Sequence, residues 1–304
     1  MNGTIIMKDK YRYFSFHRKV KIMETLAIRQ ADNDLQVVNI WLHDKAENTK
    51  KAYANDIKKF LDFIGKQLNA VTIGDIQAFM DSIGDYSPAS KARMAASIKS
   101  LFSFAKRIGY LHFDVASPIK VPKVKNTLSE RILCEEDIQK MIILTDKPRD
   151  RALLRLLYIA GLRVSEVCSL KWRDIQPANG EGAYLNIFGK GNKTRSILVD
   201  QKTYNELLDL KGDAGPDDPV FVSQKGNALS VPQAWRIVKR AAKRAKIDAA
   251  VSPHWFRHAH ASHALDRGAP IHLVQATLGH ASVATTGRYL HARPNDSSSL
   301  YLIA

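Results

Sequence analysis

The sequence has few cysteines and no long apolar run. Its 304 residues include two cysteines, Cys134 and Cys168, too few for a disulfide framework or a four-cysteine zinc site. No apolar stretch approaches the roughly 18 residues that a membrane-spanning helix needs. The first residues lack the continuous apolar core and the small-residue cleavage site of a secretion signal. We therefore expect a cytoplasmic protein with no membrane partner.

Acidic side chains are also few relative to basic ones. Asp and Glu total 30 against 46 Lys and Arg, which gives a formal net charge of +16 at pH 7. Both halves of the chain carry the excess, so it does not belong to one appended tail. Such a surface attracts polyanions, and nucleic acid is the partner that this charge favours. The alternative from charge alone is a soluble basic enzyme without a polyanionic partner.

Familiar hydrolase motifs are missing. The chain has no G-x-x-x-x-G-K-[ST] phosphate loop, no G-x-S-x-G elbow and no H-E-x-x-H zinc motif. His254, His258, His260 and His263 lie close together, but no cysteine is near them and no carboxylate separates the first two. Protein zinc sites usually draw on such further ligands. We therefore expect neither a metal nor a cofactor.

The composition is otherwise that of a globular protein, with 45% hydrophobic and 25% charged residues. The length predicts two domains. Between residues 31 and 116, apolar residues recur with the helical period in four stretches. The first stretch begins near Asp32, and the second follows a cap at Asn48 or Thr49. The third contains Ile76. The fourth begins at Ser87-Pro88 and ends at Gly109. Four such helices joined by short loops predict a small helical domain.

Residues 131–293 predict a second, mostly helical domain with a small antiparallel β-sheet. Apolar periodicity predicts helices at 133–143, 149–160, 231–246, 256–267 and 271–278. Alternation predicts strands at 183–188 and 195–199, joined by a turn of Gly189, Gly191 and Asn192, and a further short strand at 219–222. The expected fold class is therefore mainly α.

Three segments lie outside these domains. Residues 1–30 form a basic N-terminal extension, residues 117–130 form a Pro- and Lys-rich linker, and residues 294–304 form a tail that is polar and then apolar. The apolar end of the tail would be costly to leave in water. We therefore expect it to dock within the chain or on a neighbouring copy.

The second domain also holds several cationic and proton-carrying residues together with one tyrosine. Each has an ordinary structural explanation on its own, such as a helix cap, a solvated hairpin lysine or half-buried packing. Two of them form H-x-x-R, a spacing that puts both side chains on one face of a helix. The set consists of Arg163, Lys190, His254, Arg257, His280 and Tyr289.

In this order the set resembles that of the tyrosine recombinase (phage integrase) family, and of its Xer-type members in particular. The resemblance covers roughly residues 35–300 and is carried by GLRVSEVCSLKW, IFGKGNKTRSILV, SPHWFRHAHASHAL, LVQATLGHASVATT and RYLH. It implies a SAM-like core-binding fold for the four-helix domain and a catalytic role for all six residues. It also implies that Glu166 supports the first arginine, and that the protein is a site-specific DNA recombinase.

The residue types suit breakage of a phosphodiester without a metal or ATP. A tyrosine phenol can form a recoverable covalent ester, here a 3′-phosphotyrosine. The guanidiniums of Arg163 and Arg257 can brace the nonbridging oxygens. Lys190 can protonate the leaving 5′-oxygen, and His254 can accept or hold the phenol proton. His280 can donate a hydrogen bond to the phosphate.

We expect the protein to bind double-stranded DNA at the nucleoid as a homotetramer on two sites. A sister recombinase or an accessory protein is a further candidate partner. Basic side chains on the helical domain, the linker, the hairpin and helix 231–246 are candidate DNA contacts. They are Lys50, Lys51, Lys91, Arg93, Lys99, Lys123, Lys125, Lys193, Arg195, Arg236, Arg240 and Lys243.

Three other functions remain open at this point. A type IB topoisomerase-like relaxase would use the same chemistry as a monomer. A catalytically silent, architectural DNA-binding protein would keep the residues without the reaction. A metal-dependent nuclease is the least favoured of the three.

Overall fold

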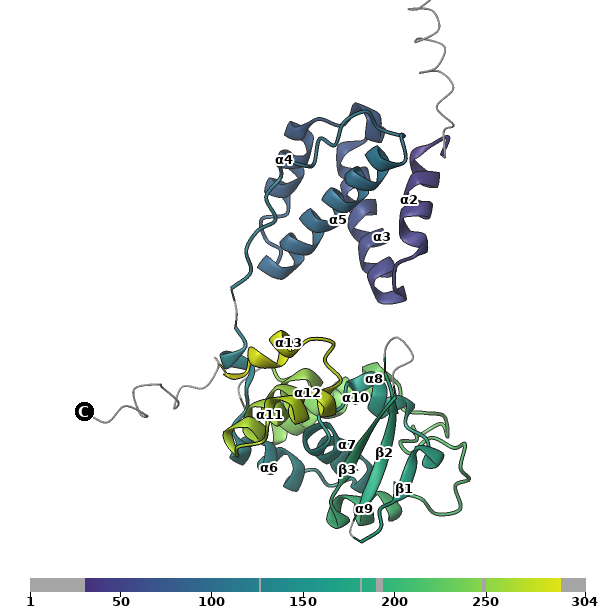
Figure 1. The fold of residues 1–304 in the computed structure, drawn as a ribbon, viewed down its shortest axis with the longest axis vertical. Coiled ribbons are helices and arrows are strands. Elements are labelled where there is room, and N and C mark those ends of the chain that lie inside the picture. Colours follow the sequence, from purple (N-terminus) through teal and green to yellow (C-terminus); the bar gives the residue numbers. More distant parts are fainter. Residues whose placement is uncertain (1–30, 126, 181, 190–193, 248–249, 291–304) are drawn as a thin grey trace, which may run out of the picture. The chain divides into compact units, whose positions relative to one another are not determined.

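The structure, a computed structural model, describes residues 31–125, 127–180, 182–189, 194–247 and 250–290. The chain divides into two compact units between Lys125 and Asn126. Both units are built mainly from helices (Figure 1), and a small antiparallel sheet belongs to the second. The mainly α fold class expected from the sequence is therefore confirmed.

The first unit packs its helices around aromatic side chains. The helices are α2 (Asp34–His43), α3 (Glu47–Ile64), α4 (Ile73–Ser82) and α5 (Pro88–Arg107). Phe60 on α3 meets Phe79 on α4 and Phe102 on α5 edge to face, with ring centroids 5.3 and 6.2 Å apart. All three rings are buried, and aromatic rings prefer this geometry in cores.

The helix ends of the first unit follow the sequence signals with one exception. Ser87 caps α5 through its hydroxyl, and Gly109 follows the helix at φ +75°. α3 begins directly after Ala46, which makes no side-chain cap. The expected caps Asn48 and Thr49 are therefore wrong, because both lie inside the first turn of the helix.

The second unit combines helices with a three-stranded antiparallel sheet of order β1-β2-β3. The strands are β1 (Ile175–Pro177), β2 (Ala183–Phe188) and β3 (Thr194–Val199). β2 and β3 pair along their whole lengths. The helices are α6 (Glu135–Ile143), α7 (Pro148–Ile159), α8 (Val164–Ser169), α9 (Gln201–Leu208), α10 (Val231–Arg244), α11 (Pro253–Asp266), α12 (Ile271–Leu278) and α13 (Val283–Gly287).

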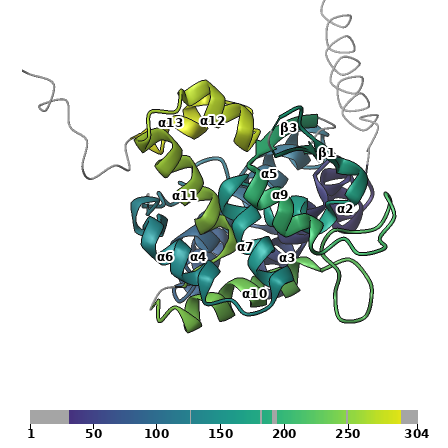
Figure 2. The ribbon, with the colours of Figure 1, turned by 90° about the horizontal axis from the view of Figure 1, so that it is seen from below.

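Helix α7 runs through the middle of the second unit (Figure 2). It packs against α6, α9 and α11 and buries side chains around most of its circumference, among them Leu153, Leu154, Leu156 and Leu157. A helix that is apolar on most sides belongs in a core. α7 is therefore a rigid element, and the candidate site lies at its C-terminal end.

The sequence predictions fail for one strand and omit several short elements. The predicted strand at 219–222 is wrong, since Lys171↔Pro219 and Val222↔Ala228 are isolated bridges. The chain turns at Gly226, which has φ +82°, and the segments on either side pair through the single bridge Val222↔Ala228, too little for a strand. β1, α8, α9 and α13 are not among the predicted elements. No helix in the described part of the chain is long and apolar enough to cross a bilayer.

Candidate active site

The expected catalytic side chains come from helix ends and helix beginnings in the second unit. They are Arg163 at the N-cap of α8, His254 and Arg257 on the first turns of α11, His280 just after the C-cap of α12, and Tyr289 after α13. The chain leaves α7 at Gly161, where φ is +57° and an added Cβ would lie 2.7 Å from the His260 ring and 2.9 Å from Leu278. Glycine therefore permits both the turn and the close approach of α11 and α12.

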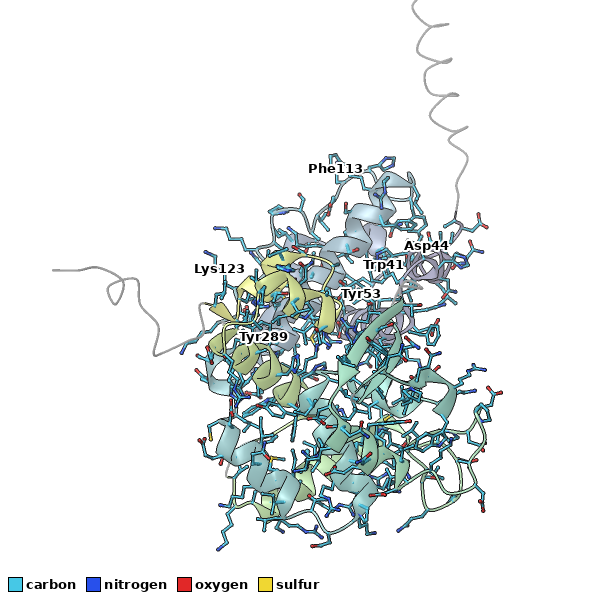
Figure 3. All side chains as sticks on the ribbon, turned by 60° about the horizontal axis from the view of Figure 1, so that its bottom comes forward. Trp41, Asp44, Tyr53, Phe113, Lys123 and Tyr289 are labelled. Carbon is cyan, nitrogen blue, oxygen red and sulfur yellow. The ribbon has the colours of Figure 1, made fainter. Side chains whose placement is uncertain are left out.

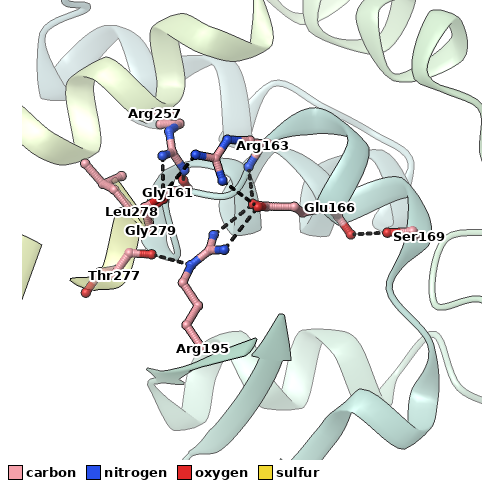
Figure 4. Close-up of polar contacts among 9 residues, drawn as sticks. All are labelled: Gly161, Arg163, Glu166, Ser169, Arg195, Arg257, Thr277, Leu278 and Gly279. Atoms are coloured by element: carbon pink, nitrogen blue, oxygen red, sulfur yellow. Dashed lines mark hydrogen bonds and ion pairs between the residues drawn. The ribbon is translucent and has the colours of Figure 1, made fainter. Parts of the chain in front are cut away.

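Glu166 is the centre of an ion-pair network (Figure 4). Its carboxylate accepts hydrogen bonds from the backbone N–H and Nη1 of Arg163, both at 2.8 Å, and from Nη1 and Nη2 of Arg195 at 3.0 and 2.8 Å. Burial alone would raise the pKa of Glu166, but hydrogen bonds from Arg195 and Arg163 outweigh burial and hold the pKa below its ordinary value. The carboxylate is therefore ionised and orients Arg163.

Arg257 is a buried cation, with 4% of its surface exposed. It donates from Nη1 to the Gly161 carbonyl at 2.7 Å and from Nη2 to the Leu278 carbonyl. Both acceptors lie at C-terminal helix ends, which carry partial negative charge. Burial, the largest cause, and repulsion from Arg163, the second, lower the pKa of Arg257 to about 10. The guanidinium stays protonated at neutral pH, and its poor hydration makes it a strong attractor for an anion.

Tyr289 lies inside the protein, with 4% of its surface exposed, in an apolar cluster with Leu265 and Leu278. Figure 3 shows it among the yellow C-terminal helices. Its hydroxyl lies 2.8 Å from Nδ1 of His258, and its ring is parallel to that of His280 with centroids 6.3 Å apart. Burial raises the pKa of Tyr289 above its ordinary value. The phenol is therefore neutral and held between two imidazoles.

The histidines around the phenol are uncharged at neutral pH. Burial is the largest cause and nearby positive charge is the second. Together they lower the pKa of His258 and the pKa of His280 to about 4. They also lower the pKa of His254. His280 Nδ1 lies 2.9 Å from the Thr286 hydroxyl. When that hydroxyl donates to Nδ1, Nε2–H of His280 remains as a donor for an anion.

The four histidines of α11 form two pairs with different surroundings. His254 stacks on His258 with centroids 6.4 Å apart. His260 Nδ1 lies 2.8 Å from the Tyr158 carbonyl, and His263 Nδ1 lies 3.0 Å from the Tyr158 hydroxyl. Within the described ranges, no group of three or more His, Cys, Asp or Glu side chains is arranged to hold a metal ion.

The structure brings five of the six expected catalytic residues together. The side chains of His254, His280 and Tyr289 each interact electrostatically with Arg257, which in turn interacts with Arg163. Lys190 lies outside the described residues, and so does Lys193.

His258 belongs to the site although the sequence prediction does not include it among the catalytic residues. It contacts the phenol hydroxyl directly. The signal in the sequence is its position one helical turn after His254 and next to Arg257. That position is equally compatible with packing or with a metal ligand.

The expected DNA-contacting residues differ in their surroundings. Several have protein partners: Lys99 donates to the carbonyls of Ser117 and Ile119, Arg93 pairs with the buried Asp56 at 3.1 Å, Arg240 lies 3.6 Å from Asp150, and Arg195 belongs to the Glu166 network. The side chain of Arg195 is engaged within the protein, and its expected contact with DNA stays a prediction. The residues at least partly exposed are Lys50, Lys51, Lys91, Lys123, Lys125, Arg236, Arg240 and Lys243.

The fold and the site define a class of protein. The guanidiniums of Arg163, Arg195 and Arg257 outnumber the single carboxylate of Glu166, so the site favours an anion. A phenol lies beside them, held by neutral imidazoles, and a phenol can attack phosphorus to form a covalent ester. This is the arrangement of a phosphoryl-transfer enzyme that uses a tyrosine.

Comparison with known proteins identifies the family. A model of the phage integrase family matches residues 131–296, and a model of the phage integrase N-terminal SAM-like domain matches residues 39–109. A tyrosine recombinase of Thermosipho africanus is 31% identical over 261 residues, which cover 81% of this chain and 89% of the relative. Tyrosine recombinase XerD of Listeria monocytogenes is 33% identical over 264 residues, which cover 80% of this chain and 88% of the relative.

Two solved structures share the fold. XerH site-specific recombinase bound to difH substrate has 21% identity and a TM-score of 0.69, covering 98% of this chain and 89% of that chain. A lambda integrase tetramer bound to a Holliday junction has 17% identity and a TM-score of 0.69, and the match covers 92% of this chain and 89% of that chain. The chain belongs to the phage integrase family of tyrosine recombinases. It is a tyrosine-type site-specific DNA recombinase, and the resemblance seen in its sequence is confirmed.

Proposed function

We propose that Tyr289 attacks a DNA phosphodiester and that the protein recombines two DNA sites through a 3′-phosphotyrosine intermediate. The bond between phosphorus and the 5′-oxygen breaks as the bond to the tyrosine oxygen forms, so the ester is conserved and ATP is not needed. A 5′-hydroxyl of the partner strand then attacks the phosphotyrosine and releases the enzyme. The observation that carries this proposal is the buried Tyr289 phenol, which is hydrogen-bonded to His258 and lies near Arg257.

Arg163 and Arg257 hold the two nonbridging oxygens of the phosphate. Glu166 orients the first guanidinium, and the carbonyls of Gly161 and Leu278 orient the second. Neither group has to reorganise as negative charge develops, which is the condition under which fixed donors stabilise a transition state most.

Two protons move in this scheme. Lys190 gives one to the departing 5′-oxygen. The phenol proton leaves toward His258, rather than toward His254, because His258 is in contact with the hydroxyl. The pKa of His258 is about 4 and that of Tyr289 lies above its ordinary 10.0, so complete transfer before attack is uphill by more than about 8 kcal/mol. His258 therefore orients the phenol, and the proton leaves only as the new phosphorus–oxygen bond forms.

Duplex DNA and further copies of the chain complete the proposal. The XerH structure contains its difH substrate and the lambda integrase tetramer contains a Holliday junction. We assign this chain two duplex sites and four copies, located at the nucleoid in the cytoplasm. The exposed side chains of Arg236, Arg240 and Lys243 on α10 are candidate phosphate contacts.

Suicide substrates test the nucleophile. The protein first selects duplexes that it binds from a random pool. These duplexes are then made with a nick near the bound region. When the protein cleaves such a duplex, the short fragment next to the nick diffuses away, so the strand cannot be rejoined and the covalent adduct accumulates. The wild type, Tyr289→Phe and Tyr184→Phe are compared on a denaturing gel in the presence of EDTA. Tyr184 is exposed on β2 and serves as the matched control. A covalent adduct is expected for the wild type and Tyr184→Phe and is absent for Tyr289→Phe.

The other outcomes identify the alternatives. An adduct that persists in Tyr289→Phe means that another residue is the nucleophile. Selected DNA that is bound but never joined to protein favours the silent architectural role. A two-site plasmid then separates recombination from relaxation, because recombination gives rearranged products and relaxation gives only topoisomers. Cleavage that EDTA abolishes would indicate a metal-dependent nuclease.

A further inference from the structure

Arg195 is charged but largely enclosed within the second unit. It is the second residue of β3, and its side chain is 13% exposed. Nε donates to the Thr277 carbonyl at 2.7 Å, while Nη1 and Nη2 donate to the two oxygens of Glu166 at 3.0 and 2.8 Å (Figure 4). A guanidinium supplies this planar pair of donors together with a third donor, and a lysine ammonium does not.

The contacts of Arg195 join separate parts of the site. Glu166 orients Arg163, and Thr277 lies next to the last residue of α12. Gly279, with φ +64°, lies directly against the guanidinium, since an added Cβ would be 3.2 Å from Nη1 of Arg195. Arg163 Nη2 also donates to the Gly279 carbonyl at 3.3 Å. The two arginines therefore hold Glu166 and the turn after α12 as one assembly.

A DNA contact that drew the Arg195 guanidinium out of this position would disturb the assembly. Three of its five N–H groups already have protein acceptors, and its side chain is only 13% exposed, so such a movement would break these hydrogen bonds. Glu166 is buried and would lose part of the charge compensation that its carboxylate needs. Arg163 shares the same carboxylate, so its orientation would change as well.

We propose that Arg195 is a positioning residue of the active site, which fixes Arg163 through Glu166 and fixes His280 through the turn at Thr277–Gly279, without contacting DNA. This inference rests on the proposed function, because Arg163 and His280 are its targets.

The test compares Arg195→Lys with Arg155→Lys. Arg155 is a matched control, because its side chain is 14% exposed and Nε donates to Glu206 at 2.7 Å, between α7 and α9. DNA affinity and single-turnover adduct formation at saturating DNA are measured for each. Arg195→Lys is expected to form adduct about 10²-fold more slowly with unchanged DNA affinity. Arg155→Lys is expected to leave both quantities unchanged.

A double-mutant cycle tests whether Arg195 acts through Arg163. If it does, the double variant of Arg163→Lys and Arg195→Lys is slowed by less than the product of the two single effects, and the remaining extra slowing reflects the route through His280. Effects that multiply in full would overturn the proposal that Arg195 acts through Arg163. Weaker DNA binding by Arg195→Lys, with an unchanged rate at saturation, would assign the residue to DNA instead.

Hydrogen exchange tests the same inference without any reaction. The amides of Gly279 and His280 donate to the carbonyls of Ala276 and Gln275 at 3.0 and 3.2 Å. These amides are expected to exchange faster in Arg195→Lys than in the wild type and Arg155→Lys. Unchanged exchange would overturn the inference, even if no adduct at Tyr289 is found. A missing wild-type adduct with faster exchange would instead count against the proposed function alone.

Discussion

At the scale of single residues, the tyrosine is held in two different ways. Its ring lies in an apolar cluster with Leu265 and Leu278, and its hydroxyl contacts His258. Packing fixes the position of the ring but not the direction of the O–H bond. When the phenol donates to Nδ1 of the neutral imidazole, this hydrogen bond fixes that direction. Tyr289 is therefore positioned by packing and oriented by His258.

Replacing His258 with alanine is expected to slow adduct formation by about 10- to 10²-fold, because the phenol loses its hydrogen-bond acceptor. The measurement is the single-turnover rate at saturating DNA, with DNA affinity determined in parallel. His272→Ala is the control, since His272 is exposed on α12. If both variants cleave at the wild-type rate, the hydrogen bond has no part in the reaction.

The sequence predicts the chemical groups of the site better than their contacts. The order and spacing of Arg163, Arg257 and Tyr289 are enough to indicate the chemistry. The hydrogen bond of Tyr289 joins residues 31 positions apart, and the bond from Arg195 to Thr277 spans 82 positions. Such partners are set by how α11, α12 and β3 pack. No local pattern in the sequence reports that packing.

At the scale of elements, the site depends on helix ends that approach closely. The carbonyls after α7 and at the end of α12 receive the N–H groups of Arg257. Gly161 and Gly279 provide the left-handed turns at these two ends, with φ of +57° and +64°. The turns thus direct carbonyl groups toward a buried cation that would otherwise lack acceptors.

Gly161→Ala is expected to lose clearly more stability than Gly268→Ala. Both glycines have positive φ, but an alanine Cβ at Gly161 meets His260 and Leu278, while nothing lies within 4 Å at Gly268. The left-handed conformation alone costs about 1 kcal/mol, and the clash adds about 1–3 kcal/mol. Urea unfolding of both variants measures the difference. Equal losses would mean that the neighbours of Gly161 move aside freely.

Elements with a clear apolar period are predictable from the sequence, while most short ones are not, and α9 is not predicted although it has eight residues, as α12 has. α5, α7, α10 and α12 have enough apolar positions for the helical period to stand out, and β2 alternates over its whole length. β1, α8 and α13 are only three to six residues long, so no period can be recognised. Their conformation follows from neighbours that are distant in the sequence.

At the scale of the whole molecule, positive charge is the dominant property. Arg236 and Lys243 are exposed on α10, while Arg240 lies 3.6 Å from the acidic Asp150. If Arg236 and Lys243 each neutralise one phosphate, Arg236→Gln and Lys243→Gln each reduce the salt slope of DNA binding by about 1.

Titrations at several salt concentrations measure that slope on the selected site and on unrelated duplexes. Lys202→Gln is the control, because Lys202 is exposed on α9. Equal weakening on every sequence identifies phosphate contacts. Weakening confined to the selected site would assign these side chains to base recognition instead.

Acid sensitivity is a second property of the whole molecule. The pKa values of His258, His260 and His280 are each lowered to about 4 from 6.5. The unfolded chain therefore takes up protons as the pH falls below 6.5, while the folded chain does not, so stability is present above 6.5 and is lost toward pH 4. His260 is the most buried of the three and accounts for the largest share of that loss, while solvent partly screens His258 and His280, which account for less. Urea unfolding between about pH 7.5 and 5 reports mainly on the histidines, because burial raises the pKa of Glu166 but hydrogen bonds from Arg195 and Arg163 outweigh burial and hold it below 4.5. His260→Asn is expected to flatten this dependence and the exposed control His272→Asn to retain it. A wild-type stability that stays constant over this range would mean that the three rings are protonated within the folded protein at little cost.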